Sequence, residues 1–151
     1  EVASETFRGG PRILVFGCDH GADVAKLAGS GIAAVSLPCT GMLPPPFVDF
    51  VLSRDLADGV MLTGCRNAHC RARLGVRWTE ERIEGRRDPA LRARVPRERF
   101  ARVWASSSDM SALKAGLSAF AARLKSLDGR PATTEKKRTD ERRATEAGGR
   151  A

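Results

Sequence analysis

The sequence predicts an α/β domain built on a small parallel sheet of about four strands, with helices on both faces. Two observations lead to this fold class. Four short apolar runs of strand length recur along the chain, and segments with helical character lie between them. Strands that alternate with helices favour parallel pairing, because each crossover returns the chain to the same end of the sheet. The 151 residues suit one such domain with its own hydrophobic core.

The predicted strands are runs rich in β-branched and other apolar residues. The first three lead into a cysteine: the first ends at Cys18, and the next two are followed closely by Cys39 and Cys65. The fourth leads into a run of three serines. The predicted strands span residues 12–18, 32–38, 59–63 and 100–105.

The segments between and after the strands carry helix signals. Residues 21–30 are bounded by glycines and predict a short helix, and three prolines introduce a second helix over 47–54, where proline is tolerated in the first turn. Residues 74–95 are polar, and we expect them to be helical in part with a break at Asp88-Pro89. The last helix, 110–127, has leucine and phenylalanine at helical spacing behind several N-cap candidates.

The ends of the chain differ in composition from its centre. Residues 1–11 are predicted to be a linker or N-terminal extension, and residues 12–127 the folded domain. Residues 128–151 contain no Ile, Leu, Val, Phe or Trp, so we expect a disordered, charged tail. The chain starts at Glu1 without a methionine, which leads us to expect a processed product or the C-terminal piece of a longer polypeptide.

The expected compartment is the cytoplasm. No apolar run reaches the length of about eighteen residues needed to span a membrane, and no signal peptide is visible. We therefore expect no transmembrane segment, and contact with the inner face of a membrane only through a larger complex.

The formal net charge of +8 is concentrated in one segment. Twelve arginines and five acidic residues lie between Arg66 and Arg102. Such a segment binds a polyanion or docks on an acidic protein. The chain has no Tyr, two Trp and six Phe, which is poor material for stacking bases, so we expect a protein partner and no nucleic acid. We expect this arginine-rich segment to be the docking surface, and charge reversal at Arg86, Arg87, Arg92 and Arg94 to slow electron transfer to the partner.

The candidate site consists of the four cysteines. A parallel sheet brings its strand ends to one edge, with neighbouring strands about 5 Å apart, so the thiols are expected to converge there. Four thiolates are the usual ligands of a [2Fe–2S] or [4Fe–4S] cluster and of structural zinc. The candidate ligands are Cys18, Cys39, Cys65 and Cys70.

The residues alone leave several interpretations of these thiols open. Structural zinc usually takes two close Cys pairs, and only Cys65 and Cys70 are close, which favours a cluster, with [2Fe–2S] slightly ahead of [4Fe–4S]. Buried or redox-active free thiols and disulfides are the alternatives. His20 and His69 lie beside two of the cysteines, and we interpret them as neighbours and not ligands. The chain has no dinucleotide fingerprint, P-loop or nucleophile elbow.

An ordered set of motifs resembles a known family over roughly residues 12–127. The most specific part is Ala-Asp-Gly-Val at 57–60 followed by Gly-Cys-x4-Cys at 64–70. This set is similar to that of the delta subunit of methyl-viologen-reducing hydrogenase, a family also called the hydrogenase iron–sulfur subunit. The other matching residues are Phe16 and Cys18, Gly21-Ala22-Asp23, Cys39-Thr40-Gly41, Gly75, Arg99 and Trp104 to Asp109.

The resemblance implies a flavodoxin-like or Rossmann-like domain with a [2Fe–2S] cluster on the four cysteines. It implies an electron-transfer subunit that relays electrons within a hydrogenase- or heterodisulfide-reductase-like complex and catalyses no bond chemistry itself. The implied partners are hydrogenase-like, flavin-bearing or respiratory redox subunits. Two positions depart from the family pattern: Asp19-His20 stands where a second cysteine usually follows the first, and Arg71 stands where histidine usually follows the last.

A different class of function stays open beside this one. The chain could be a zinc-stapled or thiol-bearing interaction module that binds a polyanion through its arginine-rich segment. A visible absorption spectrum distinguishes the two, because iron–sulfur clusters are coloured and zinc is not.

Overall fold

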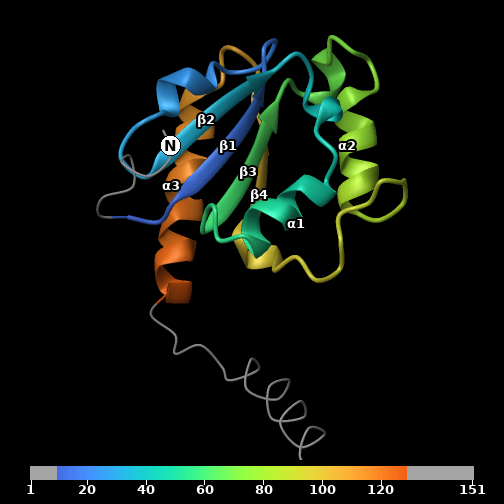
Figure 1. Ribbon diagram of the computed structural model, residues 1–151. Coiled ribbons are helices and arrows are strands. Elements are labelled where there is room, and N and C mark those ends of the chain that lie inside the picture. The colour runs from blue at the N-terminus through green and yellow to red at the C-terminus, as the bar shows by residue number, and fades with distance from the viewer. Residues whose placement is uncertain (1–9, 129–151) are drawn as a thin grey trace, which may run out of the picture.

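The computed structural model describes residues 10–128 and contains a four-stranded sheet in which all neighbours are parallel (Figure 1). The strands are β1 (Ile13–Cys18), β2 (Ile32–Leu37), β3 (Gly59–Gly64) and β4 (Phe100–Trp104). Their order in the sheet is β2-β1-β3-β4. The chain therefore leaves β1 for β2 on one side and continues with β3 on the other, which makes a topological switch point between β1 and β3. The predicted α/β fold with a flavodoxin-like parallel sheet is confirmed.

Helices cover both faces of the sheet (Figure 1). The long helix α3 (Met110–Asp128) lies on one face, and α1 (Pro46–Ser53) and α2 (Gly75–Ile83) lie on the other. α1 begins at the third of three prolines, whose fixed φ suits a first helical turn. β3 packs closely on α3, since a Cβ at Gly59 would lie 2.6 Å from the Leu124 side chain.

The two cores follow the alternation of side chains along the strands. On the α3 face, Ile13, Val15 and Met61 are buried against Leu113, Leu117, Phe120 and Leu124. On the opposite face, Phe16, Val60 and Leu62 pack with Val48, Val51 and Ile83 of α1 and α2. Successive residues of β3 thus enter different cores, so the sheet is buried on both sides.

Two helix predictions are corrected. Residues 21–30 form only the short 3-10 helix η1 (Val24–Leu27), because Gly21 and Ala22 pack under the end of β4. The N–H of Ala22 donates to the Ala105 carbonyl at 3.0 Å, and a Cβ at Gly21 would lie 3.0 Å from the backbone of Gly64. Within 74–95, helix α2 ends at Ile83, so the chain turns before the expected break at Asp88-Pro89; the remainder is irregular and contributes Leu91 and Val95 to the core.

The expected linker and tail lie almost wholly outside the described residues. Within the described part of the chain, no helix is both long and apolar enough to cross a membrane.

Candidate functional site

Three loops carry the four cysteines to the carboxyl edge of the sheet. Cys18 is the last residue of β1, Cys39 follows β2 by two residues, and Cys65 directly follows β3. Cys70 comes after the 3-10 helix η3 (Asn67–His69) in the same loop as Cys65. All four are free thiols. β1 and β3 flank the switch point, where open α/β sheets have their ligand crevice.

Cys18 and Cys65 form the inner part of this group. Each is only 4% exposed, and both pack against Val76 of α2, with Cys70 and Trp104 partly buried beside them. Burial, with a smaller contribution from the nearby Cys18 and Cys70 thiols, raises the pKa of the Cys65 thiol to about 11, although a hydrogen bond from the Arg71 backbone N–H opposes the change. At neutral pH the metal-free Cys65 is therefore a neutral thiol, and binding a metal there releases its proton.

Cys39 and Cys70 are half-buried and meet at the first residue of α2, Gly75. A Cβ at Gly75 would lie 2.5 Å from the Cys39 sulfur and 3.4 Å from the Cys70 sulfur. Gly41 is also close, since its Cβ would lie 3.3 Å from the Gly75 Cα and 3.5 Å from the Cys39 sulfur. Any side chain at Gly75 would thus occupy the space between two thiols, so the glycine keeps this space open.

Two hydrogen bonds hold the Cys39 loop against the rest of the edge. The buried Thr40 hydroxyl donates to the Thr63 carbonyl at 3.1 Å, which ties the loop to the end of β3. Nη1 of Arg82, from α2, donates to the Gly41 carbonyl at 2.9 Å. Thr40 and Arg82 therefore position Cys39 without contacting its sulfur themselves.

Backbone N–H groups point at two of the sulfurs. The N–H of His20 donates to the Cys18 sulfur at 3.4 Å, and the N–H of Arg71 donates to Cys65. The Cys18 thiol in turn lies 3.8 Å from the Pro38 carbonyl, to which it donates. Donors aimed at sulfur favour the thiolate, which is the form that binds metal.

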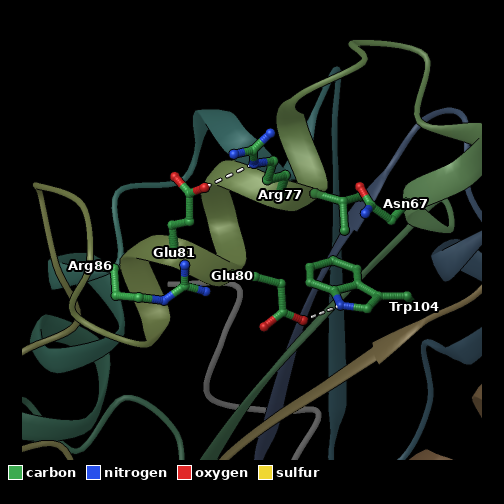
Figure 2. A pocket seen from close by; sticks show the side chains of 7 residues that line it. Asn67, Arg77, Glu80, Glu81, Arg86 and Trp104 are labelled. Carbon is green, nitrogen blue, oxygen red and sulfur yellow. Dashed lines mark hydrogen bonds and ion pairs between the residues drawn. The ribbon is translucent and has the colours of Figure 1, made fainter.

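Trp104 and Glu80 close one side of the cysteine group. Trp104 ends β4 and pairs in register with Gly64, so its ring reaches the cysteines. Figure 2 shows its indole N–H donating to the Glu80 carboxylate, while Arg77 pairs with Glu81 nearby. Trp104 and Val76 also line a pocket of about 330 Å³, and its remaining walls are Asn67, Arg77, Glu80, Glu81 and Arg86. Apart from its place in the family motif, no feature of the sequence indicated that Trp104 lies at the site.

The histidines do not join the buried group. His20 and His69 are exposed, next to Cys18 and Cys70 in sequence. Among residues 10–128, no three His, Cys, Asp or Glu side chains are arranged to hold a metal ion as they stand. The structure thus brings the four predicted cysteines to one edge, two inside and two at the rim, without a preformed metal geometry.

An ion pair fixes the loop that carries Cys65 to the start of α3. Arg66 lies 2.9 Å from the Asp109 carboxylate, directly before the helix. Hydrogen bonds from the Ser106 hydroxyl and backbone N–H, with the Arg66 charge, hold the pKa of Asp109 below its usual range against the effect of burial. Asp109 is therefore ionised at neutral pH and restrains Arg66 beside the thiols.

Comparison with known families agrees with the sequence motifs. The family model described as methyl-viologen-reducing hydrogenase, delta subunit, matches residues 13–128, which is most of the chain and includes every strand, every α-helix and all four cysteines. The chain belongs to the family of the delta subunit of methyl-viologen-reducing hydrogenase.

Proposed function

We propose that the chain is an electron-transfer subunit that holds a [2Fe–2S] cluster on Cys18, Cys39, Cys65 and Cys70. The observation that carries the proposal is the convergence of four free thiols, from three separate loops, on the carboxyl edge at the switch point. Four thiolates are the ligand set that such clusters use. When bound there, the cluster would supply one-electron redox chemistry.

The arrangement of the thiols favours a binuclear group. Cys18 and Cys65 are the inner pair, packed against Val76, and Cys39 and Cys70 are the outer pair on either side of Gly75. A structural zinc site usually takes its thiolates from two short knuckles. Here both pairs of thiols come from separated segments, which suits the two irons of a binuclear cluster better. Cys39 and Cys70 lie on loops, so small loop shifts can complete the geometry around the buried pair.

The protein supplies the environment of the bound group. Val76 and Trp104 cover its inner side and limit the access of water. The N–H groups of His20 and Arg71 stabilise negative charge on sulfur. The family supports a place within a hydrogenase-associated redox complex, and we propose that the chain passes electrons between neighbouring redox subunits there.

Anaerobic purification of the whole chain tests the proposal. We expect about two iron and two sulfide per chain, a brown colour and an EPR signal after one-electron reduction. Separate Cys→Ser variants at the four positions should each lose most of the iron, because a hard oxygen replaces a soft thiolate poorly. Stoichiometric zinc without iron in the anaerobic protein would refute the cluster and favour the zinc-stapled interaction module.

A further inference from the structure

Most arginines of the basic segment are engaged within the protein. Seven of the twelve between Arg66 and Arg102 form ion pairs with carboxylates, and three more donate to backbone carbonyls. The pairs include all four arginines that we expected to dock a partner: Arg86 with Glu84, Arg87 with Glu81, and Arg92 and Arg94 with Asp49. The density of arginines along the sequence therefore does not show which arginines remain available to bind a partner.

The remaining two are Arg71 and Arg73. Both are exposed, and neither guanidinium has an ion pair or hydrogen bond to any residue within 10–128. They occupy the loop between Cys70 and α2, where the backbone N–H of Arg71 donates to Cys65 and that of Arg73 donates to the Cys70 carbonyl at 2.9 Å. The two free cations thus lie in the loop that carries a thiol.

The backbone of Arg73 is held in an unfavourable conformation. Its φ is +57°, a left-handed value that costs a residue with a side chain about 1 kcal/mol or more. A glycine would adopt this φ freely, yet the position carries an exposed cation. Asp55, at the amino end of the sheet, has a similar φ of +55°, so this loop is distinguished by its charge and its neighbours.

Two exposed apolar side chains adjoin this loop. Met42 is 64% exposed and Leu74 is 39% exposed. Met42 directly follows Gly41, and Leu74 directly precedes Gly75. These two glycines pack together beside the Cys39 and Cys70 sulfurs. Methionine and arginine are both enriched at protein interfaces, and here they lie in adjoining loops.

We propose that Arg71, Arg73, Met42 and Leu74 form the docking surface for an acidic redox partner protein. This rests on the proposed function, because the surface lies over the two outer thiols, where electrons would enter or leave. Charge complementarity selects the occupant. At this end of the sheet Asp109 is paired with Arg66 and Asp23 with Lys26, whereas Asp19 keeps its negative charge and accepts a hydrogen bond from Ser36, so the two unpaired arginines outnumber it. Two unpaired cations around an apolar centre suit an acidic protein surface, and they are too few for a tight phosphate backbone site.

Binding of a small acidic [2Fe–2S] ferredoxin to the full chain tests the surface. We expect titration calorimetry at about 20 mM NaCl to show binding that weakens steadily towards about 200 mM. The double variant Arg71→Glu/Arg73→Glu should bind about tenfold more weakly or worse, and its binding should depend less on salt. The control Lys114→Glu/Lys125→Glu makes the same change in net charge on exposed positions of α3, on the helix that covers the opposite face, and should bind within about twofold of the parent.

Several outcomes would overturn the proposal. Equal weakening in both variants would show attraction by net charge alone, and no binding to the parent at low salt would exclude the acidic partner. Tighter binding of a single-stranded oligonucleotide, lost only in the Arg71/Arg73 variant, would assign the surface to a polyanion. Self-association through this face, seen by light scattering and lost in that variant, would assign it to a second copy. Ferredoxin binding is measured independently of iron content, so a chain that binds ferredoxin without a cluster would refute the proposed function and leave the surface intact.

Discussion

The two ends of the same sheet are built differently. At the amino end, Arg12 precedes β1 and binds Asp58, which precedes β3, through its backbone N–H at 2.7 Å and its Nη2 at 2.8 Å. Arg12 also pairs with Asp55, and Arg99 donates to the Asp58 carbonyl at 2.9 Å. At the carboxyl end, three of the four strands lead into cysteines, and Arg71 and Arg73 in the adjoining loop have no side-chain partner among the described residues.

This difference separates the part that stabilises the fold from the part that we propose binds the cluster and the partner. Every charged group of the amino-end cluster has a partner of opposite charge, which offsets the cost of partial burial. The carboxyl end keeps glycine gaps beside the outer thiols, two buried thiols and two unpaired arginines, none of which strengthens the fold. Substitutions at the two ends should therefore have opposite consequences for stability and for cluster binding.

The largest expected effect lies at the carboxyl end, in Gly75→Ala. The added methyl carbon would lie 2.5 Å from the Cys39 sulfur, which is too close, so the sulfur must move and we expect loss of most of the bound iron. The metal-free fold should change by less than about 2 kcal/mol in unfolding free energy, because the Cys39 loop can shift and alanine favours the helix. Iron analysis and chemical denaturation measure the two quantities.

Gly29→Ala is the matched control for this substitution. The nearest atom to its new methyl group is the Leu27 carbonyl oxygen, at 4.0 Å, and the site lies between η1 and β2. We expect parental iron content. Full iron in Gly75→Ala as well would show that the gap between Cys39 and Cys70 is not part of the site.

At the amino end, we expect Arg12→Ala to have a smaller effect, which lowers the stability of the fold and leaves the iron content unchanged. It removes several charge-assisted hydrogen bonds and leaves Asp58 partly buried, so we expect a loss of about 2 kcal/mol in unfolding free energy with unchanged iron content. Lys125→Ala, at an exposed position of α3 with no side-chain partner among residues 10–128, should change the free energy of unfolding by less than about 0.5 kcal/mol. Iron loss in Arg12→Ala would contradict the separation of the two ends.

The same substitution has a predicted pH dependence. Burial raises the pKa of Asp58, but the hydrogen bonds and charge of Arg12 outweigh it, so the pKa is lowered overall. A lowered pKa contributes stability above the unfolded value of about 4, and that contribution is lost as pH falls through the lower folded value. The stability gap between parent and Arg12→Ala should therefore be widest near neutral pH and narrow below about pH 4.

The fold was largely predictable because its signals are local. Both faces of β3 are buried, so its sequence is a nearly uniform apolar run. Cysteines lie at or just after the ends of three strands. The segment 21–30 was mispredicted because its form depends on contact with Gly64 and Ala105, which lie far along the chain. Tertiary contacts of this kind override the local preference for a helix.

The convergence of the four cysteines on one edge of the sheet was predictable, and the side chains around them were not. Trp104 reaches the cysteines only because β4 pairs with β3 in the register that places it opposite Gly64. The count of arginines could not show that Arg94 binds the buried Asp49 while Arg71 stays unpaired within the described chain. Which charges neutralise one another is decided by the folded chain. The ion pairs narrow the expected docking surface from the whole segment 66–102 to the loop that follows Cys70.

The smallest expected effects come from the histidines, His20→Ala and His69→Ala. Both side chains are exposed, and the hydrogen bond from His20 to the Cys18 sulfur comes from its backbone N–H, which alanine retains. We therefore expect parental iron content and at most a small shift in reduction potential, measured by redox titration followed by EPR.

Cys18→Ala gives the comparison that decides the ligand at this position. Cys18 is buried beside Cys65, and alanine removes its thiolate while leaving the strand end intact, so we expect the iron to be lost. The opposite pair of results, with iron kept in Cys18→Ala and lost in His20→Ala, would mean that the loop turns His20 inward. The centre would then have three cysteines and one histidine, a ligand set that raises the reduction potential. The ligand assignment at Cys18 would be wrong, whereas the electron-transfer proposal would stand.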